Sequence, residues 1–329
     1  MQTPIYSNSN IESPTNLLRS VNKEFQKMDA FSRTQKVLLM GLGASGKSSI
    51  RAVVFEGKTP DDVKDYHATI NYTRSTKNII NTAFQIFDCG GQESFLSVFV
   101  GEQAEFIFTD VEILVWVVDV SDFDQVSTSK FYFTHAINKL NEYSPRAVAF
   151  CLLHKTDLLL PHMKDEVTET LKEYFVPPKN SKIQIRHYNT SIFENSIFRA
   201  IGDLIQTIIL KKAGGGDISQ TIQQFIEMNK ELSGITVYTE DGLPIFEEGP
   251  MAHNIMIPAN LWLTNYERIT ADFASDETLK TILETNDYLF VFQRIQSELV
   301  LNGIARKVAP LQYLLVKMDS LAEMINALL

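Results

Sequence analysis

One glycine-rich turn constrains the fold of this chain more than any other feature of its sequence. The turn contains Gly41, Gly43 and Gly46, and it follows residues 36–40, an apolar run typical of a buried strand. A helical pattern begins directly after the turn and extends through Val54. A strand, a tight glycine turn and a helix in this order are typical of α/β proteins.

Apolar strand-like runs and helical patterns continue to alternate as far as residue 212. The further predicted strands cover residues 84–87, 113–118, 148–153 and 183–187, and the predicted helices lie near residues 128–142, 162–175 and 195–210. This alternation predicts a mostly parallel sheet with helices on both faces, in one α/β domain of residues 34–212.

Three consecutive glycines interrupt the pattern after this domain. They lie within residues 213–217, where Asp217 stands in the N-cap position of the next helix, so that we predict a linker there. The remainder, residues 218–329, is predicted to be a small α+β domain. Its expected elements are a helix near 218–232, a hairpin of strands 235–238 and 244–247, a helix near 258–273, strands near 288–295 and 298–306, and a helix near 310–329.

Residues 1–33 form a predicted N-terminal extension. Its first 16 residues are rich in Ser, Asn, Thr and Pro, which is typical of disorder. Leu17, Val21 and Phe25 then recur at helical spacing and predict a short amphipathic helix. We expect this helix to pack on the domain or on a partner, with binding to a membrane surface as the alternative.

The charge balance argues against a partner that is bound through nucleic-acid phosphates. The first 216 residues carry 23 Lys and Arg against 24 Asp and Glu, and the remaining residues carry 7 against 16. No region is therefore basic enough for such a surface.

The cysteine content and the apolar runs indicate where the protein works. With two cysteines and no apolar run near the ~20 residues of a spanning helix, the sequence suggests a cytoplasmic protein without a membrane anchor of its own. Recruitment to membranes would then require partners.

The glycine-rich turn also carries chemistry. The segment from Gly41 to Ser48 matches the phosphate-binding pattern of Gly, four residues, Gly, Lys and Ser. Glycines let backbone N–H groups curl around a phosphate, and the start of the following helix adds positive partial charge. Lys47 can reach the β- and γ-phosphates and the Ser48 hydroxyl can ligate Mg²⁺, so the sequence predicts a nucleoside triphosphate site.

Residues around the next predicted strand fit the terminal phosphate of such a ligand. Asp88 follows the strand at 84–87 and can hold Mg²⁺ through water. The Gly91 N–H can face a γ-phosphate, and Gln92 can orient an attacking water. Thr69 lies between the phosphate-loop helix and this strand, where a switch segment would bring a hydroxyl to the metal.

Two further strand ends predict that the base is guanine. Asp157 follows the strand at 148–153 and would accept hydrogen bonds from guanine N1–H and the exocyclic amine, a donor pair that adenine lacks. The stem of Lys155 can lie against the base. Ser191 and Ile192 follow the strand at 183–187, where a backbone N–H can reach guanine O6. An ATPase or a kinase is the weaker alternative.

These residues make the chain resemble the Ras-like GTPase superfamily and, within it, the Rag/Gtr family of nutrient-sensing GTPases. His154 replaces the Asn of the usual guanine motif, as it does in Rag proteins, and residues 36–42 and 190–198 look like the corresponding Rag segments. The resemblance covers residues 34–212. Residues 218–329 are similar in outline to the roadblock/longin-type domain that follows the GTPase domain in Rags and pairs their subunits.

The resemblance implies a role for each residue of the site, with GTP or GDP and Mg²⁺ as cofactors. The phosphates would be wrapped by Gly41, Gly43, Ala44, Ser45, Gly46, Lys47, Ser48 and Ser49. The metal would be held by Ser48, Thr69 and Asp88, and the catalytic residues would be Gln92, Lys47 and Thr69, with Gly91 beside the γ-phosphate. The base would be bound by His154, Lys155, Asp157, Ser191 and Ile192.

The resemblance also implies a GTP/GDP switch with slow, partner-controlled hydrolysis. No arginine finger is identified, because neither Arg51 nor Arg74 has an assigned role. The γ-phosphate would order the segments around residues 58–75 and 91–110, and its loss would release them. The alternative is a dimeric scaffold that binds GTP or GDP with negligible hydrolysis.

Protein partners are expected on the same grounds. The C-terminal domain would form a homodimer or a heterodimer, and activating and exchange proteins would act on the switch segments. Residues 68–70 and 88–92 look like the A-type Rags, whereas residues 41–42 and 46–50 look more like the C-type, so the subclass stays open.

Three residues carry expectations of their own. The Asn that His154 replaces ties the base loop to the phosphate loop, so a weaker affinity for the base is expected. A side chain at Gly43 would crowd the transition-state region, so glycine there is compatible with hydrolysis. Cys89 is interpreted as a small residue beside the metal, with a redox-reactive thiol as the alternative.

Overall fold

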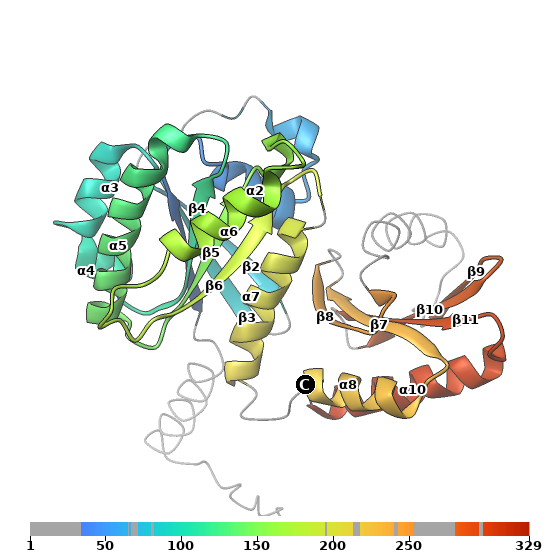
Figure 1. Ribbon diagram of the computed structural model, residues 1–329. Helices are drawn as coiled ribbons and strands as arrows, with labels where there is room; N and C mark the ends of the chain where they lie inside the picture. The colour runs from blue at the N-terminus through green and yellow to red at the C-terminus, as the bar shows by residue number, and fades with distance from the viewer. Residues whose placement is uncertain are drawn as a thin grey trace, which may run out of the picture. The chain divides into compact units, whose positions relative to one another are not determined.

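The computed structural model describes residues 34–64, 66, 72–79, 82–194, 196–212, 218–239, 243–252, 280–295 and 299–328 (Figure 1). The chain divides into two compact units at Thr34 and Gln35, and the elements described below belong to the second unit, Gln35–Leu329. The predicted N-terminal helix, the predicted linker at 213–217 and the predicted helix near 258–273 lie outside the described residues.

A six-stranded sheet forms the first part of this unit. Its strands are β1 (Gln35–Gly41), β2 (Tyr72–Ile79), β3 (Thr82–Cys89), β4 (Val111–Asp119), β5 (Val148–His154) and β6 (Gln184–Thr190), in the order β2-β3-β1-β4-β5-β6. All neighbouring strands are parallel except β2 and β3. The predicted mostly parallel sheet is therefore confirmed. The sequence analysis missed β2, because this edge strand is largely polar and has no apolar run.

Helices and short 3₁₀ turns connect these strands. The α-helices are α2 (Lys47–Phe55), α3 (Glu93–Val100), α4 (Ala104–Phe108), α5 (Val126–Tyr143), α6 (Lys164–Tyr174) and α7 (Ser196–Lys212). The 3₁₀ turns are η1 (Pro60–Val63), η2 (Phe123–Gln125) and η3 (Thr156–Leu158). Both α3 and α4 fall in the expected switch segment 91–110, for which no helix was predicted.

Alternating residues of the central strands show that helices cover both faces of the sheet. Leu38 and Met40 of β1 pack in one apolar cluster with residues of α3, α4 and α5. Val37 and Leu39 point the other way and pack in a second cluster with residues of α2 and α7. Because successive side chains of a strand alternate between faces, a strand buried on both sides reads as a continuous apolar run.

The carboxyl ends of the parallel strands meet at one edge of this sheet. Leu39 of β1 is the register partner of Asp88 on β3, and His154 of β5 is the partner of Thr190 on β6. The loops that follow these strands therefore start from neighbouring positions. This arrangement explains how motifs far apart in the sequence come together.

A five-stranded antiparallel sheet forms the C-terminal part. Its strands are β7 (Leu232–Thr239), β8 (Pro244–Glu248), β9 (Lys280–Glu284), β10 (Tyr288–Ile295) and β11 (Leu299–Arg306), in the order β8-β7-β11-β10-β9, with the helices α8 (Ile218–Met228) and α10 (Leu311–Leu328). The predicted α+β character is confirmed, although β9 was not predicted. The helix predicted to reach residue 232 ends at Met228, because Leu232 already begins β7.

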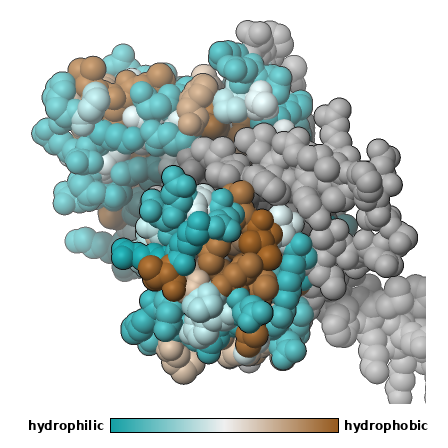
Figure 2. All heavy atoms as spheres, turned by 90° about the vertical axis from the view of Figure 1, so that its right-hand side faces the viewer, coloured by the Kyte–Doolittle hydropathy of each residue, from teal (hydrophilic) through white to brown (hydrophobic). Residues whose placement is uncertain are grey.

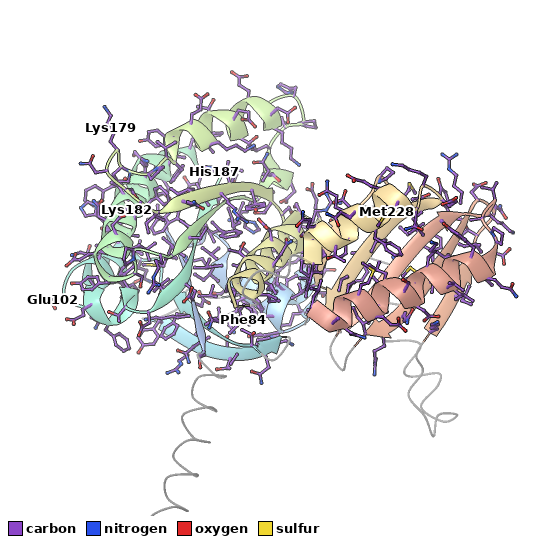
Figure 3. All side chains as sticks on the ribbon, turned by 90° about the horizontal axis from the view of Figure 1, so that it is seen from below. Phe84, Glu102, Lys179, Lys182, His187 and Met228 are labelled. Atoms are coloured by element: carbon purple, nitrogen blue, oxygen red, sulfur yellow. The ribbon has the colours of Figure 1, made fainter. Side chains whose placement is uncertain are left out.

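Most of the apolar positions on α8 and α10 are core. Ile222, Phe225, Leu321 and Ile325 are buried, whereas Met324 is 39% exposed. Apolar side chains nevertheless reach the surface of the C-terminal part (Figure 2). They include Met228 of α8, which is 71% exposed (Figure 3), and Val316 of α10, which is 66% exposed.

Among the described residues, no helix is both long and apolar enough to cross a membrane.

Candidate functional site

A cavity of about 380 Å³ opens at the carboxyl edge of the six-stranded sheet. The predicted site residues that line this cavity are Gly43, Ala44, Gly46, Lys47, Ser48, Ser49, Gly91, Gln92, Lys155 and Ile192. The remaining lining residues are Pro60, Val63, Lys64, Tyr66 and Phe193. The structure thus brings the phosphate loop, the segment after β3 and the two predicted base loops to one cavity.

The phosphate loop leaves the start of α2 free of side-chain caps. Gly46 is the N-cap residue, with a φ of 97°, and Ala44 has a φ of 59°. Both values are left-handed, and only glycine adopts such a conformation at little cost. The first N–H groups of a helix have no partner within the helix, so an anion placed here can accept their hydrogen bonds.

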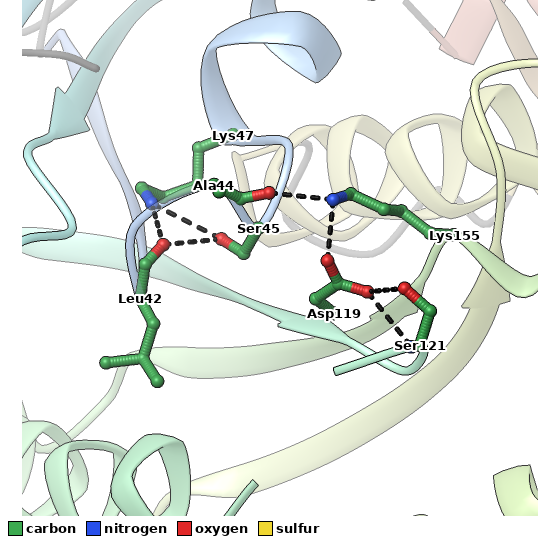
Figure 4. Close-up of polar contacts among 7 residues, drawn as sticks. All are labelled: Leu42, Ala44, Ser45, Lys47, Asp119, Ser121 and Lys155. Carbon is green, nitrogen blue, oxygen red and sulfur yellow. Dashed lines mark hydrogen bonds and ion pairs between the residues drawn. The ribbon is translucent and has the colours of Figure 1, made fainter. Parts of the chain in front are cut away.

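Lys47 lies buried beneath this loop. Its Nζ donates to the carbonyl oxygen of Leu42 at 2.7 Å and to Ser45 Oγ at 3.3 Å (Figure 4). Ser45 is itself buried and donates to the same carbonyl at 2.9 Å, so it shapes the loop and does not line the cavity. Burial lowers the pKa of Lys47 to about 8, although Asp88 nearby acts in the opposite direction.

Asp88 at the end of β3 is fully buried. Its Oδ2 accepts a hydrogen bond from Arg51 Nε at 3.3 Å, whereas Oδ1 has no hydrogen-bond partner among the described residues. Ser48 lines the cavity one turn before Arg51 on α2. A buried carboxylate oxygen with no partner among the described residues fits a hard cation such as Mg²⁺ or a water bound to it.

Cys89, the neighbour of Asp88, is also fully buried and forms no disulfide. Burial, followed by the charge of Asp88, raises the pKa of its thiol to about 12. A thiol with so high a pKa is a poor nucleophile. This environment supports the interpretation of Cys89 as a small structural residue.

Gly91 packs directly against the phosphate loop. A Cβ added to it would lie 2.4 Å from the carbonyl of Leu42 and 2.5 Å from the backbone nitrogen of Gly43. A Cβ on Gly43, by contrast, would meet Gly91 O at 3.8 Å, an ordinary contact. A side chain at Gly43 would therefore not crowd the protein itself, and any crowding would be with a bound substrate. Gln92 follows as the exposed N-cap residue of α3 and borders the cavity.

His154 is a buried packing residue and does not line the cavity. Its Nδ1 lies 3.0 Å from Thr190 Oγ1, and a Cβ on Gly46 would lie 2.7 Å from its ring. Burial lowers the pKa of His154 to about 4, so the ring is neutral at physiological pH. The ring fills the space between the phosphate loop and β6.

Lys155 connects the loop after β5 to the phosphate loop. Its Nζ donates to the carbonyl oxygen of Ala44 at 2.8 Å and to Asp119 Oδ2 at 2.5 Å (Figure 4). Asp119 ends β4 and also accepts from the N–H and the hydroxyl of Ser121, at 2.9 and 2.6 Å. Burial opposes the charge of Asp119, but these hydrogen bonds hold its pKa below the usual value. Lys155 thus ties the loop after β5 to the phosphate loop, whereas the weaker base affinity expected from His154 stays a prediction.

The remaining predicted base residues take different positions. Asp157 is exposed on η3 and does not line the cavity, whereas Ile192 does. Ser191 is buried; its N–H donates to Ser196 Oγ at 3.0 Å and its Oγ accepts from the N–H of Phe193 at 3.1 Å. Thr69, the predicted switch threonine, lies outside the described residues.

Besides the lining residues of segment 60–66, three further residues with no predicted role belong to this site. Asp119 directly follows the predicted strand at 113–118, so its place at the carboxyl edge was a usable signal. Phe193 follows Ile192, lines the cavity and is 59% exposed. Arg51 lies one helical turn after Ser48, a spacing that places the two on one side of α2.

Comparisons with known proteins identify the family of this chain. The family model "Gtr1/RagA G protein conserved region" matches residues 36–236. The chain is 32% identical to the GTP-binding protein gtr1 of Schizosaccharomyces pombe over 53% of this chain and 56% of the relative. It is 30% identical to the Ras-related GTP-binding protein A of Dictyostelium discoideum over 53% of this chain and 58% of the relative.

More distant proteins are similar as well. The human Ras-related GTP-binding protein C is 29% identical over 55% of this chain and 45% of that protein. Among solved structures, the Arl6 BBS3 small GTPase of Trypanosoma brucei matches with a TM-score of 0.42 and 20% identity, over 53% of this chain and 96% of that chain. The match spans about half the length of the curated relatives. Because the family model covers more than half of it, the chain belongs to the Gtr1/RagA G protein family.

Proposed function

We propose that this protein is a guanine-nucleotide switch that hydrolyses GTP slowly and with Mg²⁺. The observation that carries the proposal is the cavity at the carboxyl edge of the sheet, where the phosphate loop, Gln92 and Lys155 meet. A site for a nucleotide needs phosphate donors at one end and a place for the base at the other. The residues that line the cavity support an assignment of both ends.

The phosphate end is formed by the loop that includes Gly43 and Lys47. The uncapped start of α2 supplies backbone donors and partial positive charge, and Lys47 supplies a full charge. Lys47 already bonds to Leu42 O, so its ammonium group is fixed close to the loop. A phosphate that bound here would replace or share these contacts.

The base end is formed by Lys155 and by the turn of Ile192 and Phe193. The aliphatic stem of Lys155 offers an apolar surface, since its Nζ is fixed by Ala44 O and Asp119. The aromatic ring of Phe193 offers a second surface. Asp157, exposed on η3, is our proposed acceptor for the guanine N1–H and amine.

The metal end would use Ser48 and Asp88. The buried Asp88 Oδ1, which has no partner among the described residues, and the hydroxyl of Ser48 fit an Mg²⁺ ion with its bound water. When bound, the ion would neutralise charge that develops on the phosphates. Thr69 is proposed as a further ligand on the basis of the sequence alone.

Slow hydrolysis is proposed because, among the described residues, the cavity lining contains Gln92 but no arginine. Gln92 is exposed at the cavity, where it can orient a water toward a terminal phosphate. An arginine that stabilises the transition state would then come from an activating partner. Pro60, Tyr66, Gly91 and Gln92 all border the cavity, which supports the segments 58–75 and 91–110 as the switch segments.

We further propose that the protein pairs with itself or with a related chain through its C-terminal part. We also propose that it works in the cytoplasm, with partners that bring it to membranes. Exposed apolar side chains on α8 and α10 support the pairing. Cys89 and Cys151, both free and buried, fit a reducing compartment.

Nucleotide binding is tested by calorimetry of the full chain with GTP, GDP and ATP in the presence of Mg²⁺. We expect uptake of GTP and GDP but not of ATP. Hydrolysis is tested by the single-turnover rate of bound GTP in wild type and in Gln92→Leu. A rate that falls in the variant supports the switch, whereas equal and negligible rates would favour the scaffold.

A further inference from the structure

Arg51 forms ion pairs with two carboxylates, Asp88 and Glu56. Its Nε donates to Asp88 Oδ2 at 3.3 Å, and its other end contacts Glu56 Oε1 through Nη1. The Arg51 side chain is 19% exposed, and the Asp88 side chain is 0% exposed. The pair is therefore largely removed from water.

The two oxygens of Asp88 have different environments. Oδ2 is held by Arg51, whereas Oδ1 is buried without a partner among the described residues. The carboxylate thus presents one paired and one unpaired oxygen. The unpaired oxygen is the one that fits the metal or its water.

A buried carboxylate that loses the cation bonded to it is costly, because its charge is not solvated and is less well balanced. Beside a phosphate site the cost is greater, since the carboxylate also repels the phosphates. Arg51 removes this cost by a permanent positive charge. The same charge lies near the proposed metal and weakens the attraction between Asp88 and Mg²⁺.

We propose that Arg51 is a built-in counter-ion for Asp88 that makes nucleotide retention depend less on Mg²⁺. With the metal bound, Arg51 competes for the carboxylate and lowers the affinity for Mg²⁺. With the metal removed, Arg51 keeps Asp88 neutralised, and the nucleotide stays bound longer. This inference rests on the proposed function, and it assigns Arg51 a positioning and electrostatic role that does not include contact with substrate.

Glu56 fixes the other side of Arg51. It lies at the C-terminal end of α2 and pairs with Arg51 Nη1, while Lys58 approaches its second oxygen at 3.7 Å. Loss of Glu56 leaves the charge of Arg51 beside Asp88 in place. Glu56→Gln is therefore a matched control that perturbs the same guanidinium without removing it.

The experiment measures the dissociation of a fluorescent GDP analogue from the full chain, once with saturating Mg²⁺ and once with excess EDTA. For Arg51→Met we expect the ratio of the two rates, EDTA over Mg²⁺, to rise at least about tenfold above wild type. We also expect a lower Mg²⁺ concentration for half-maximal slowing of dissociation. Arg51→Lys and Glu56→Gln are expected to keep ratios close to that of wild type.

A general structural defect would raise both rates of Arg51→Met together and leave the ratio unchanged, which would overturn the proposal. If Arg51→Met does not fold, the same substitution is made in the variant Asp88→Asn, in which no carboxylate is left to neutralise. In the Asp88→Asn background, the additional change Arg51→Met should leave the ratio of the two dissociation rates equal to that of Asp88→Asn alone. A tenfold rise of this ratio would overturn the proposal. Wild type that binds no GDP analogue would instead refute the proposed function itself.

Discussion

Lys155 Nζ donates to the carbonyl oxygen of Ala44 at 2.8 Å, and so joins the loop after β5 to the phosphate loop across 111 positions of the sequence. The ion pair of the same ammonium group with Asp119 fixes its direction. Both backbone positions are left-handed, with φ values of 59° at Ala44 and 65° at Lys155. Non-glycine residues rarely adopt this conformation, and such strain concentrates at functional sites.

The first prediction concerns the ion pair between Asp119 and Lys155. Asp119→Asn should weaken GDP binding about tenfold, because Lys155 loses the charged partner that aims it at Ala44 O and the base. Titration with a fluorescent GDP analogue measures the change. Ser121→Ala is the control, since it removes a hydrogen bond to Asp119 and leaves the ion pair intact. Equal affinities of Asp119→Asn and wild type would contradict the role of the pair.

A second prediction compares two glycines that face each other. Gly91→Ala should lower the free energy of unfolding by about 1–3 kcal/mol, because its Cβ would overlap the backbone of Leu42 and Gly43. Gly43→Ala should change stability far less, since its Cβ finds ordinary contacts. Urea denaturation measures both. If Gly43→Ala slows single-turnover hydrolysis without loss of stability, the crowding of the transition state is supported.

The third prediction concerns the charge of Lys47. Its pKa of about 8 is lowered mainly by burial, and a bound phosphate would favour the charged form and raise it. The protein should therefore take up protons when it binds GTP near pH 8, and its affinity should fall as the pH rises through this value. Calorimetry in buffers of different ionisation enthalpy detects the uptake. Binding without proton uptake at pH 8 would show that Lys47 is not at the phosphates.

A fourth prediction follows from the buried ring of His154. Its pKa is about 4 in the folded protein and 6.5 in the absence of perturbation, so the unfolded chain binds more protons between these values. This group therefore destabilises the fold progressively as the pH falls from 6.5 to 4, by up to about 3 kcal/mol. The free energy of unfolding of His154→Gln should depend less on pH in this window. His187→Gln, at a half-buried position, is the comparison and should show a smaller change.

The last prediction concerns pairing through the C-terminal part. Val316→Glu places a charge on an exposed apolar position of α10, and if α10 lies in a dimer interface, the variant should be monomeric. Light scattering of the full chain measures its mass. Val308→Glu is a suitable control, because Val308 is 90% exposed in a turn outside the helices. A wild type that is monomeric at every concentration would refute self-pairing.

The parts of the fold that sequence predicts best are those with a strong local signal. The buried strands β1, β4 and β5 are continuous apolar runs, and their predicted positions agree with the structure within two residues. β2 has no such signal, because its residues are stabilised by pairing with β3 at the sheet edge. Helix α8 ends earlier than its apolar pattern suggests, because tertiary pairing of Leu232 in β7 overrides local preference.

The site shows the same division. The phosphate loop has a local spacing that sequence can recognise, and the structure places most of its predicted residues at the cavity, although Ser45 lies buried beside it. The ion pair between Arg51 and Asp88 was not predicted, because an arginine on a helix can equally well extend into solvent. The two residues meet because of the register of β3 in the sheet. The buried position of Ser191 likewise depends on Ser196, a contact that no spacing rule reveals.

The uncapped start of α2 has a consequence for the life of the protein in the cell. A first helical turn that lacks a side-chain acceptor leaves its N–H groups to water or to an anion, so the nucleotide that we propose to bind there would also stabilise the fold. We expect the melting temperature to rise with the concentration of guanine nucleotide. A lower concentration of guanine nucleotide would then lower the fraction of folded protein and leave more of it open to proteolysis.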